Sequence, residues 1–129
     1  MPPRPGLTAT VSLDVTDLDT AIAVGSGDVA VLATPRVVAL AEEASVKAVH
    51  DALAPGTTTV GYRVQLDHLA PTVPGTTVQA EATLETVEGR RLTFRVAITD
   101  SRGLVAAGRI TRVSVERDRF MEKAAGGGA

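Results

Sequence analysis

The sequence of 129 residues contains no cysteine and no tryptophan, with one tyrosine and two phenylalanines. Without cysteine there can be no disulfide bond, no thiolate zinc site and no thiol nucleophile. Because 44 % of the residues are nevertheless hydrophobic, the core must consist mainly of valine, leucine, isoleucine and alanine. Side chains of this size each bury little area, so we expect a modestly stable domain that gains from forming oligomers.

An excess of basic charge is also missing, since 13 Lys and Arg face 15 Asp and Glu, for a net charge of −2. The two signs are interspersed, which excludes the basic stripe of a nucleic-acid-binding protein and the cationic amphipathic helix of a membrane anchor. No apolar run approaches the length of a membrane span, and the proline-rich start has no apolar signal core. We therefore expect a cytoplasmic protein that binds neither nucleic acid nor membrane.

Hydrophobic periodicity predicts one domain over residues 1–129, with flexible ends at 1–6 and 124–129. Strict alternation over 7–15 predicts a half-buried strand. Residues 17–31 are ambiguous and combine a short helix near 18–24 with a loop at 25–28 that is flexible enough to act as a gate.

A helix is predicted over 34–53, where Thr34 is a good N-cap and Pro35 fits the first helical position. Pro55 and Gly56 end the helix. Its charged face contains Arg36, Glu43, Lys47, His50 and Asp51, and its apolar face contains Val38, Ala41, Ser45, Ala48, Val49 and Ala52.

The remainder predicts antiparallel strands at 58–69, 77–87, around 92–98 and at 104–115, with a helical turn near Phe120. A single amphipathic helix followed by a long meander must be wrapped by that meander, because its apolar stripe has no other partner. This order is similar to that of the α+β hotdog fold, in which an antiparallel sheet of about five strands surrounds one long central helix.

Two side chains stand out on predicted inward faces. Glu42 lies about 60° from the centre of the apolar stripe and about 120° from the charged face, where a carboxylate needs a hydrogen bond. His68 ends the row of even positions of strand 58–69. A Glu that reaches water at the edge of the stripe, or a structural histidine, would give the same pattern. His50 is interpreted as a surface residue.

Thr34 and Gly61 carry weaker signals. Capping explains Thr34 fully, although its position at the positive end of the helix favours developing negative charge nearby. Gly61, inside a strand, indicates a bulge or a place where a ligand approaches the backbone. Phosphate-binding loops, a nucleophile elbow and a metal-ligand constellation are not found in the sequence.

The stretch from Val31 to Ala44 resembles the central helix of the fluoroacetyl-CoA thioesterase family, a hotdog family. Val60-Gly61 and the segment from His68 to Gly75 are similar to that family's Gly/His segment, and the hairpin from Glu88 to Leu92 resembles its following hairpin. The spacings of Thr34, Glu42, Gly61 and His68 match without a gap. The resemblance covers most of the chain from about Val29 onward.

The resemblance implies hydrolysis of a small acyl-CoA, with Thr34, Glu42 and His68 as catalytic residues and Gly61 and Arg112 in contact with the substrate. It implies no cofactor, since coenzyme A enters as part of the substrate. The family's fluoroacetate-selective member has a phenylalanine-bearing lid before the catalytic threonine, whereas residues 24–29 contain no aromatic side chain. The sequence also has Arg109-Ile110 where the family has Thr-His. Fluoroacetyl selectivity is therefore not expected.

Geometry suggests how such a site is completed. Eight residues of helix, about 12 Å along the axis, separate Thr34 from Glu42, so other elements must close the site. The resemblance to hotdog proteins, whose dimers place sites at the interface, implies a homodimer or a dimer of dimers with the site between subunits. Glu42 would be the general base, while His68 positions or protonates. Two alternatives on the same fold are an acyl-CoA carrier or sensor without turnover and a hydratase or dehydratase. The expected Asp/His motif of the hydratase is not found.

Overall fold

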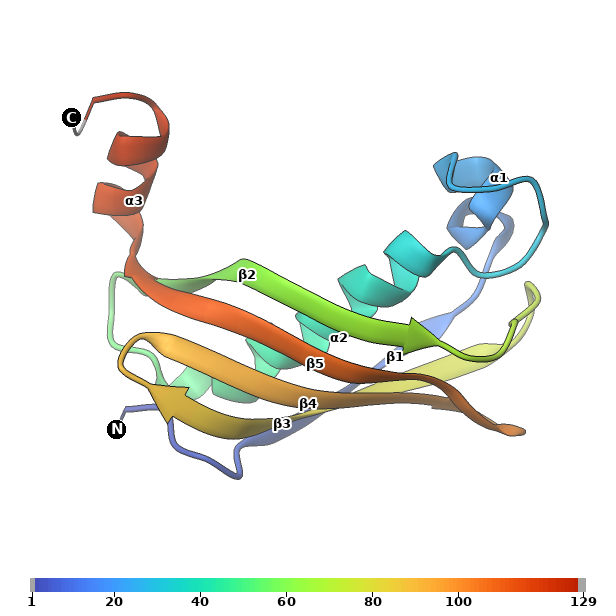
Figure 1. The fold of residues 1–129 in the computed structure, drawn as a ribbon, viewed down its shortest axis with the longest axis horizontal. Helices are drawn as coiled ribbons and strands as arrows, with labels where there is room; N and C mark the ends of the chain where they lie inside the picture. The colour runs from blue at the N-terminus through green and yellow to red at the C-terminus, as the bar shows by residue number, and fades with distance from the viewer. Residues whose placement is uncertain (1, 128–129) are drawn as a thin grey trace.

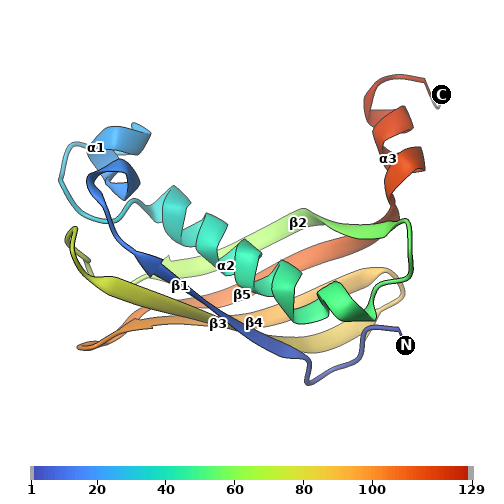
Figure 2. The same cartoon turned by 180° about the vertical axis from the view of Figure 1, so that it is seen from behind.

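The computed structural model describes residues 2–127; Met1, Gly128 and Ala129, which belong to the predicted flexible ends, lie outside the described residues. A five-stranded antiparallel sheet, in the order β1-β3-β4-β5-β2, curves around one long helix, α2 (Figures 1 and 2). The strands are β1 (Thr8–Asp14), β2 (Thr57–His68), β3 (Thr77–Glu88), β4 (Arg91–Asp100) and β5 (Gly103–Glu116). The helices are α1 (Ala21–Val24), α2 (Thr34–Val49) and α3 (Arg117–Ala124), with 3₁₀ turns η1 (Asp17–Asp19) and η2 (His50–Ala52). The predicted hotdog architecture is confirmed.

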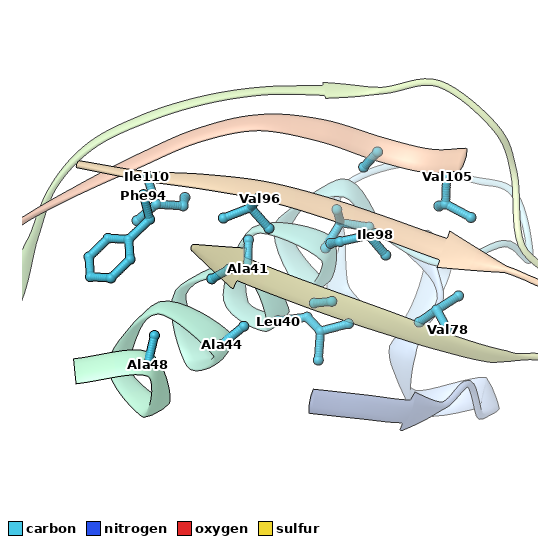
Figure 3. Packing of buried hydrophobic residues seen from close by; sticks show 14 of the residues in the cluster. Leu40, Ala41, Ala44, Ala48, Val78, Phe94, Val96, Ile98, Val105 and Ile110 are labelled. Carbon is cyan, nitrogen blue, oxygen red and sulfur yellow. The ribbon is translucent and has the colours of Figure 1, made fainter. Parts of the chain in front are cut away.

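The core lies between the concave face of the sheet and α2. Phe94 is its one aromatic residue and is fully buried. Facing it are the small side chains of α2, which let the helix approach the sheet closely (Figure 3). The buried cluster includes Leu40, Ala41, Ala44, Ala48, Val78, Val96, Ile98, Val105 and Ile110.

The buried face of α2 contains Ala41, Ser45, Ala48 and Val49, as predicted, but it is centred further round the helix than predicted. Val37, Leu40 and Ala44 are buried, whereas Val38 is only half-buried. The prediction placed the stripe too far round the helix because it gave Val38 and Ala52 the weight of core residues. Glu42 consequently lies at the margin of the buried face, on the flank toward β2 and β5, with its side chain 32 % exposed.

A β-bulge between Gly61 and Arg63 changes the phase of β2. Before the bulge, Thr59 is buried and Gly61 lies against Glu42; after it, Leu66 packs against the core. The prediction that Val60 and Tyr62 share one inward face with Leu66 and His68 is therefore wrong, because the extra residue reverses the alternation. Tyr62 is 52 % exposed, with the Arg91 guanidinium 4.8 Å from the centroid of its ring.

The segment between β1 and α2 makes an excursion that is tied at its base. Thr20 and Leu32 form a β-bridge, and the Arg36 Nε donates to Asp19 Oδ1 at 3.1 Å. The excursion carries η1 and α1, so the helix predicted near 18–24 is present in shorter form. At its tip Gly25 adopts φ +84°, a left-handed conformation that glycine supplies without steric cost.

Candidate active site

Thr34 and His68 form the first half of the candidate site. The Thr34 hydroxyl and His68 Nδ1 lie 2.8 Å apart, and join the first turn of α2 to the last residue of β2. The prediction that Thr34 caps the helix is wrong: Ala33 is the N-cap, its carbonyl accepts the first helical bonds from the Arg36 and Val37 amides, and Thr34 is already helical. Because Thr34 has no capping bond to make, its hydroxyl is free to pair with the imidazole.

The His68 ring is partly removed from water. Burial lowers the pKa of His68, while an interaction with the Ala70 backbone works against this shift. Its Nε2 is buried and has no hydrogen-bond partner among residues 2–127. A neutral ring with its proton on Nε2 presents Nδ1 as an acceptor toward the Thr34 hydroxyl. This arrangement is suited to a residue that takes up a proton.

A cavity of about 360 Å³ adjoins Thr34 and His68. Ser26, Asp28 and Val29, from the excursion before α2, line it together with the segment after β2. The loop at 25–28 that was predicted as a gate therefore borders this cavity, and among residues 2–127 no Phe or Tyr side chain lines it. Larger grooves beside α3 and between β1 and α2 contain none of the predicted site residues.

Glu42 forms the second half with Arg112 and Gly61. The Arg112 Nη1 donates to Glu42 Oε2 at 2.7 Å, so the carboxylate has the hydrogen bond that its position requires. A Cβ built on Gly61 would lie 2.7 Å from that same oxygen and 3.7 Å from Nη1. Glycine is thus the residue that lets the carboxylate approach the β2 backbone, and the strand glycine marks both a bulge and a close contact.

Arg112 is held from its other side by Thr59. The Arg112 Nε donates to Thr59 Oγ1 at 2.9 Å, and Nη2 donates to the Thr59 carbonyl at 2.9 Å. Both residues are buried, with 8 % of Arg112 and 7 % of Thr59 exposed. Burial lowers the pKa of Arg112, whereas the charge and hydrogen bond of Glu42 raise it. Sequence reasoning missed Thr59, although its position two residues before the strand glycine is a usable signal.

The three predicted catalytic residues thus occur as two groups. Thr34 contacts His68, and Glu42 contacts Arg112 beside Gly61, with eight helical residues, about 12 Å of axis, between Thr34 and Glu42. Among residues 2–127 no cluster of three or more His, Cys, Asp or Glu side chains could hold a metal ion. In the same residues no helix has the length and apolarity to cross a membrane.

Comparison with known proteins identifies the family. The profile described as fluoroacetyl-CoA-specific thioesterase matches residues 15–118. The fluoroacetyl-CoA thioesterase of Streptantibioticus cattleyicolor is 38 % identical over 93 residues, which are 72 % of this chain and 67 % of that protein.

Solved structures agree with this match. The structure of the fluoroacetyl-CoA thioesterase FlK superposes with a TM-score of 0.90 at 31 % identity, covering 96 % of each chain. A Thermus thermophilus protein, described as a thioesterase superfamily member, gives a TM-score of 0.87 at 27 % identity over 97 % of this chain and 93 % of its own. This chain belongs to the fluoroacetyl-CoA-specific thioesterase family and has the hotdog fold.

Proposed function

We propose that this acyl-CoA thioesterase hydrolyses a small acyl-CoA to the free acid and coenzyme A, with Glu42, His68 and Thr34 as its catalytic residues. Relatives in this family act on CoA thioesters, and FlK variants have been solved with acetyl-CoA and with fluoroacetate and CoA. The single observation that carries the residue assignment is the Glu42 carboxyl group held by Arg112 against Gly61. Arg112 is buried, whereas the Glu42 side chain is 32 % exposed, so the paired carboxyl group is held in place and can still be reached by a substrate.

In the proposed reaction Glu42 is the general base that takes a proton from the attacking water as the water oxygen bonds to the thioester carbon. That proton passes from Glu42 to the sulfur of coenzyme A as the C–S bond breaks, while His68 and the Thr34 hydroxyl bonded to its Nδ1 position the thioester. Backbone N–H groups at the start of α2 and near Gly61 stabilise the carbonyl oxygen as it becomes anionic. Arg112 still has one uncommitted N–H on each terminal nitrogen after its bonds to Glu42 and Thr59. These can contact the substrate. No cofactor other than the CoA of the substrate takes part.

We further propose a homodimer, or a dimer of dimers, that brings the two groups of residues into one site. On one side β2 pairs with β5, and no strand among residues 2–127 pairs with its other side. Tyr62 and Val64 are exposed on this strand, at 52 % and 43 %. A strand edge of this length is a template for pairing with a second copy. Because acyl-CoA esters are intracellular metabolites, we propose that the enzyme acts in the cytoplasm. We also propose that it binds neither nucleic acid nor membrane.

Thiol release tests the activity across acetyl-, propionyl-, malonyl-, phenylacetyl- and fluoroacetyl-CoA. The proposal predicts steady turnover of at least one of the small acyl esters. Residues 24–29 contain no aromatic side chain, so fluoroacetyl-CoA should be preferred over acetyl-CoA by less than about tenfold, a difference of about 1.4 kcal/mol. Binding of these esters without thiol release would instead establish a carrier or sensor, the second candidate, and would overturn the proposal.

A further inference from the structure

The guanidinium of Arg112 is bonded along two of its edges by groups from different elements. Its Nε and Nη2 donate to the hydroxyl and the carbonyl of one residue, Thr59, while Nη1 donates to Glu42. A planar guanidinium whose three nitrogens all donate hydrogen bonds is fixed in one orientation. The direction in which Nη1 points therefore depends on Thr59.

The strand register explains why Thr59 can do this. Gly61 pairs with Arg112 across the β2–β5 ladder, and Thr59 pairs with Ser114, two residues along each strand. Residues two apart lie on the same face of a strand. Thr59 and Gly61 thus flank the Arg112 side chain on the helix side of the sheet. Glycine provides space for the carboxylate there, and threonine provides two acceptors.

We propose that Thr59 is a positioning residue of the thioesterase reaction, which fixes Arg112 so that Nη1 holds the Glu42 carboxylate over Gly61. The inference rests on the proposed role of Glu42. The two acceptors of Thr59 differ in how they can be tested. Its carbonyl belongs to the backbone and is kept in any substitution, whereas its hydroxyl is the group that accepts from the buried Arg112 Nε–H. Loss of the hydroxyl leaves a buried, charged donor unpaired, which the guanidinium can relieve by turning away from Glu42.

Three variants test this. Thr59→Val removes the hydroxyl at nearly constant volume, and Thr59→Ser retains it. Thr58→Val makes the same change at the neighbouring threonine, which pairs with Val115. The expected result for Thr59→Val is a fall in kcat of about tenfold or more with KM changed less than about threefold. Thr59→Ser should recover most of kcat, and Thr58→Val should match the wild type.

The ¹⁵N NMR signal of the Arg112 Nε–H gives a readout that does not depend on turnover. It should be protected from solvent exchange in the wild type and in Thr59→Ser, and should lose protection in Thr59→Val. If the wild type hydrolyses no acyl-CoA but this signal behaves as described, the proposed function fails while the positioning of Arg112 by Thr59 stands. Equal kcat for Thr59→Val and Thr58→Val, or unchanged protection in Thr59→Val, would overturn the inference.

Discussion

Replacing Gly61 with alanine should disable the enzyme while leaving it folded. The added Cβ would lie 2.7 Å from Glu42 Oε2, whereas ordinary contact begins at 3.4 Å, so the carboxylate must move by about 0.7 Å (3.4 − 2.7). The oxygen is the tip of a side chain that is 32 % exposed, which makes the movement inexpensive for the fold. Catalysis is less tolerant, because a displacement of about 1 Å can cost about 100-fold in rate.

We therefore expect kcat of Gly61→Ala to fall by about 10- to 100-fold in a thiol-release assay, with the melting temperature close to that of the wild type. A double-mutant cycle with Glu42→Gln separates this cause from a simple block of the substrate. If the alanine acts through the carboxylate, it should have little further effect on kcat once Glu42 is glutamine. Full activity of Gly61→Ala, or an undiminished loss in the Glu42→Gln background, would refute the reasoning.

Three other predictions follow from burial, charge and the exposed strand. Burial lowers the pKa of His68 below its usual 6.5, so near this pH the unfolded chain binds more protons than the folded chain. The free energy of unfolding should therefore decrease as pH falls from about 6.5 toward the folded-state pKa. In urea unfolding measured against pH, His68→Asn should remove this decrease, and His50→Asn, at an exposed position, should not. Arg112→Lys keeps the positive charge but loses the planar guanidinium that bonds Glu42 and Thr59 together. We expect kcat to fall at least as much as in Thr59→Val, and the free energy of unfolding to fall by about 2 kcal/mol. Wild-type values for both quantities would contradict the ion-pair assignment. Val64→Lys places a charge on the exposed edge of β2 and should shift the dimer to monomer in light scattering, with Val46→Lys on α2 as the exposed control; an unchanged dimer would exclude this edge as the interface.

Local patterns predicted most of the fold. The alternation of β1 and the strand around 92–98 appear in the structure as expected, with Ala9, Val11 and Leu13 half-buried and Phe94 and Ile98 buried. These patterns could be read because each depends on burial along one regular element. The predicted phase of β2 was wrong at Tyr62, because one bulge inverts all the alternation that precedes it.

The candidate site was less accessible from the sequence. A threonine before a proline at a helix start satisfies the rules for an N-cap, and only the backbone shows that Ala33 has this role and that Thr34 contacts His68. The contact between Glu42 and Arg112 joins residues 70 positions apart. It depends on the β2–β5 register, which the sequence does not specify. The position of Thr59 two residues before Gly61 is a sequence signal, but its hydrogen bonds to Arg112 follow from that register.

The central claim is that the Glu42 carboxylate, held by Arg112 over Gly61, performs the hydrolysis. The most direct test is kcat/KM for thiol release by wild type and Glu42→Gln on the best small acyl-CoA, with Glu43→Gln, the exposed neighbour on α2, as control. We predict a loss of at least about 100-fold for Glu42→Gln and no loss for Glu43→Gln. Equal activity of Glu42→Gln and the wild type would contradict the account.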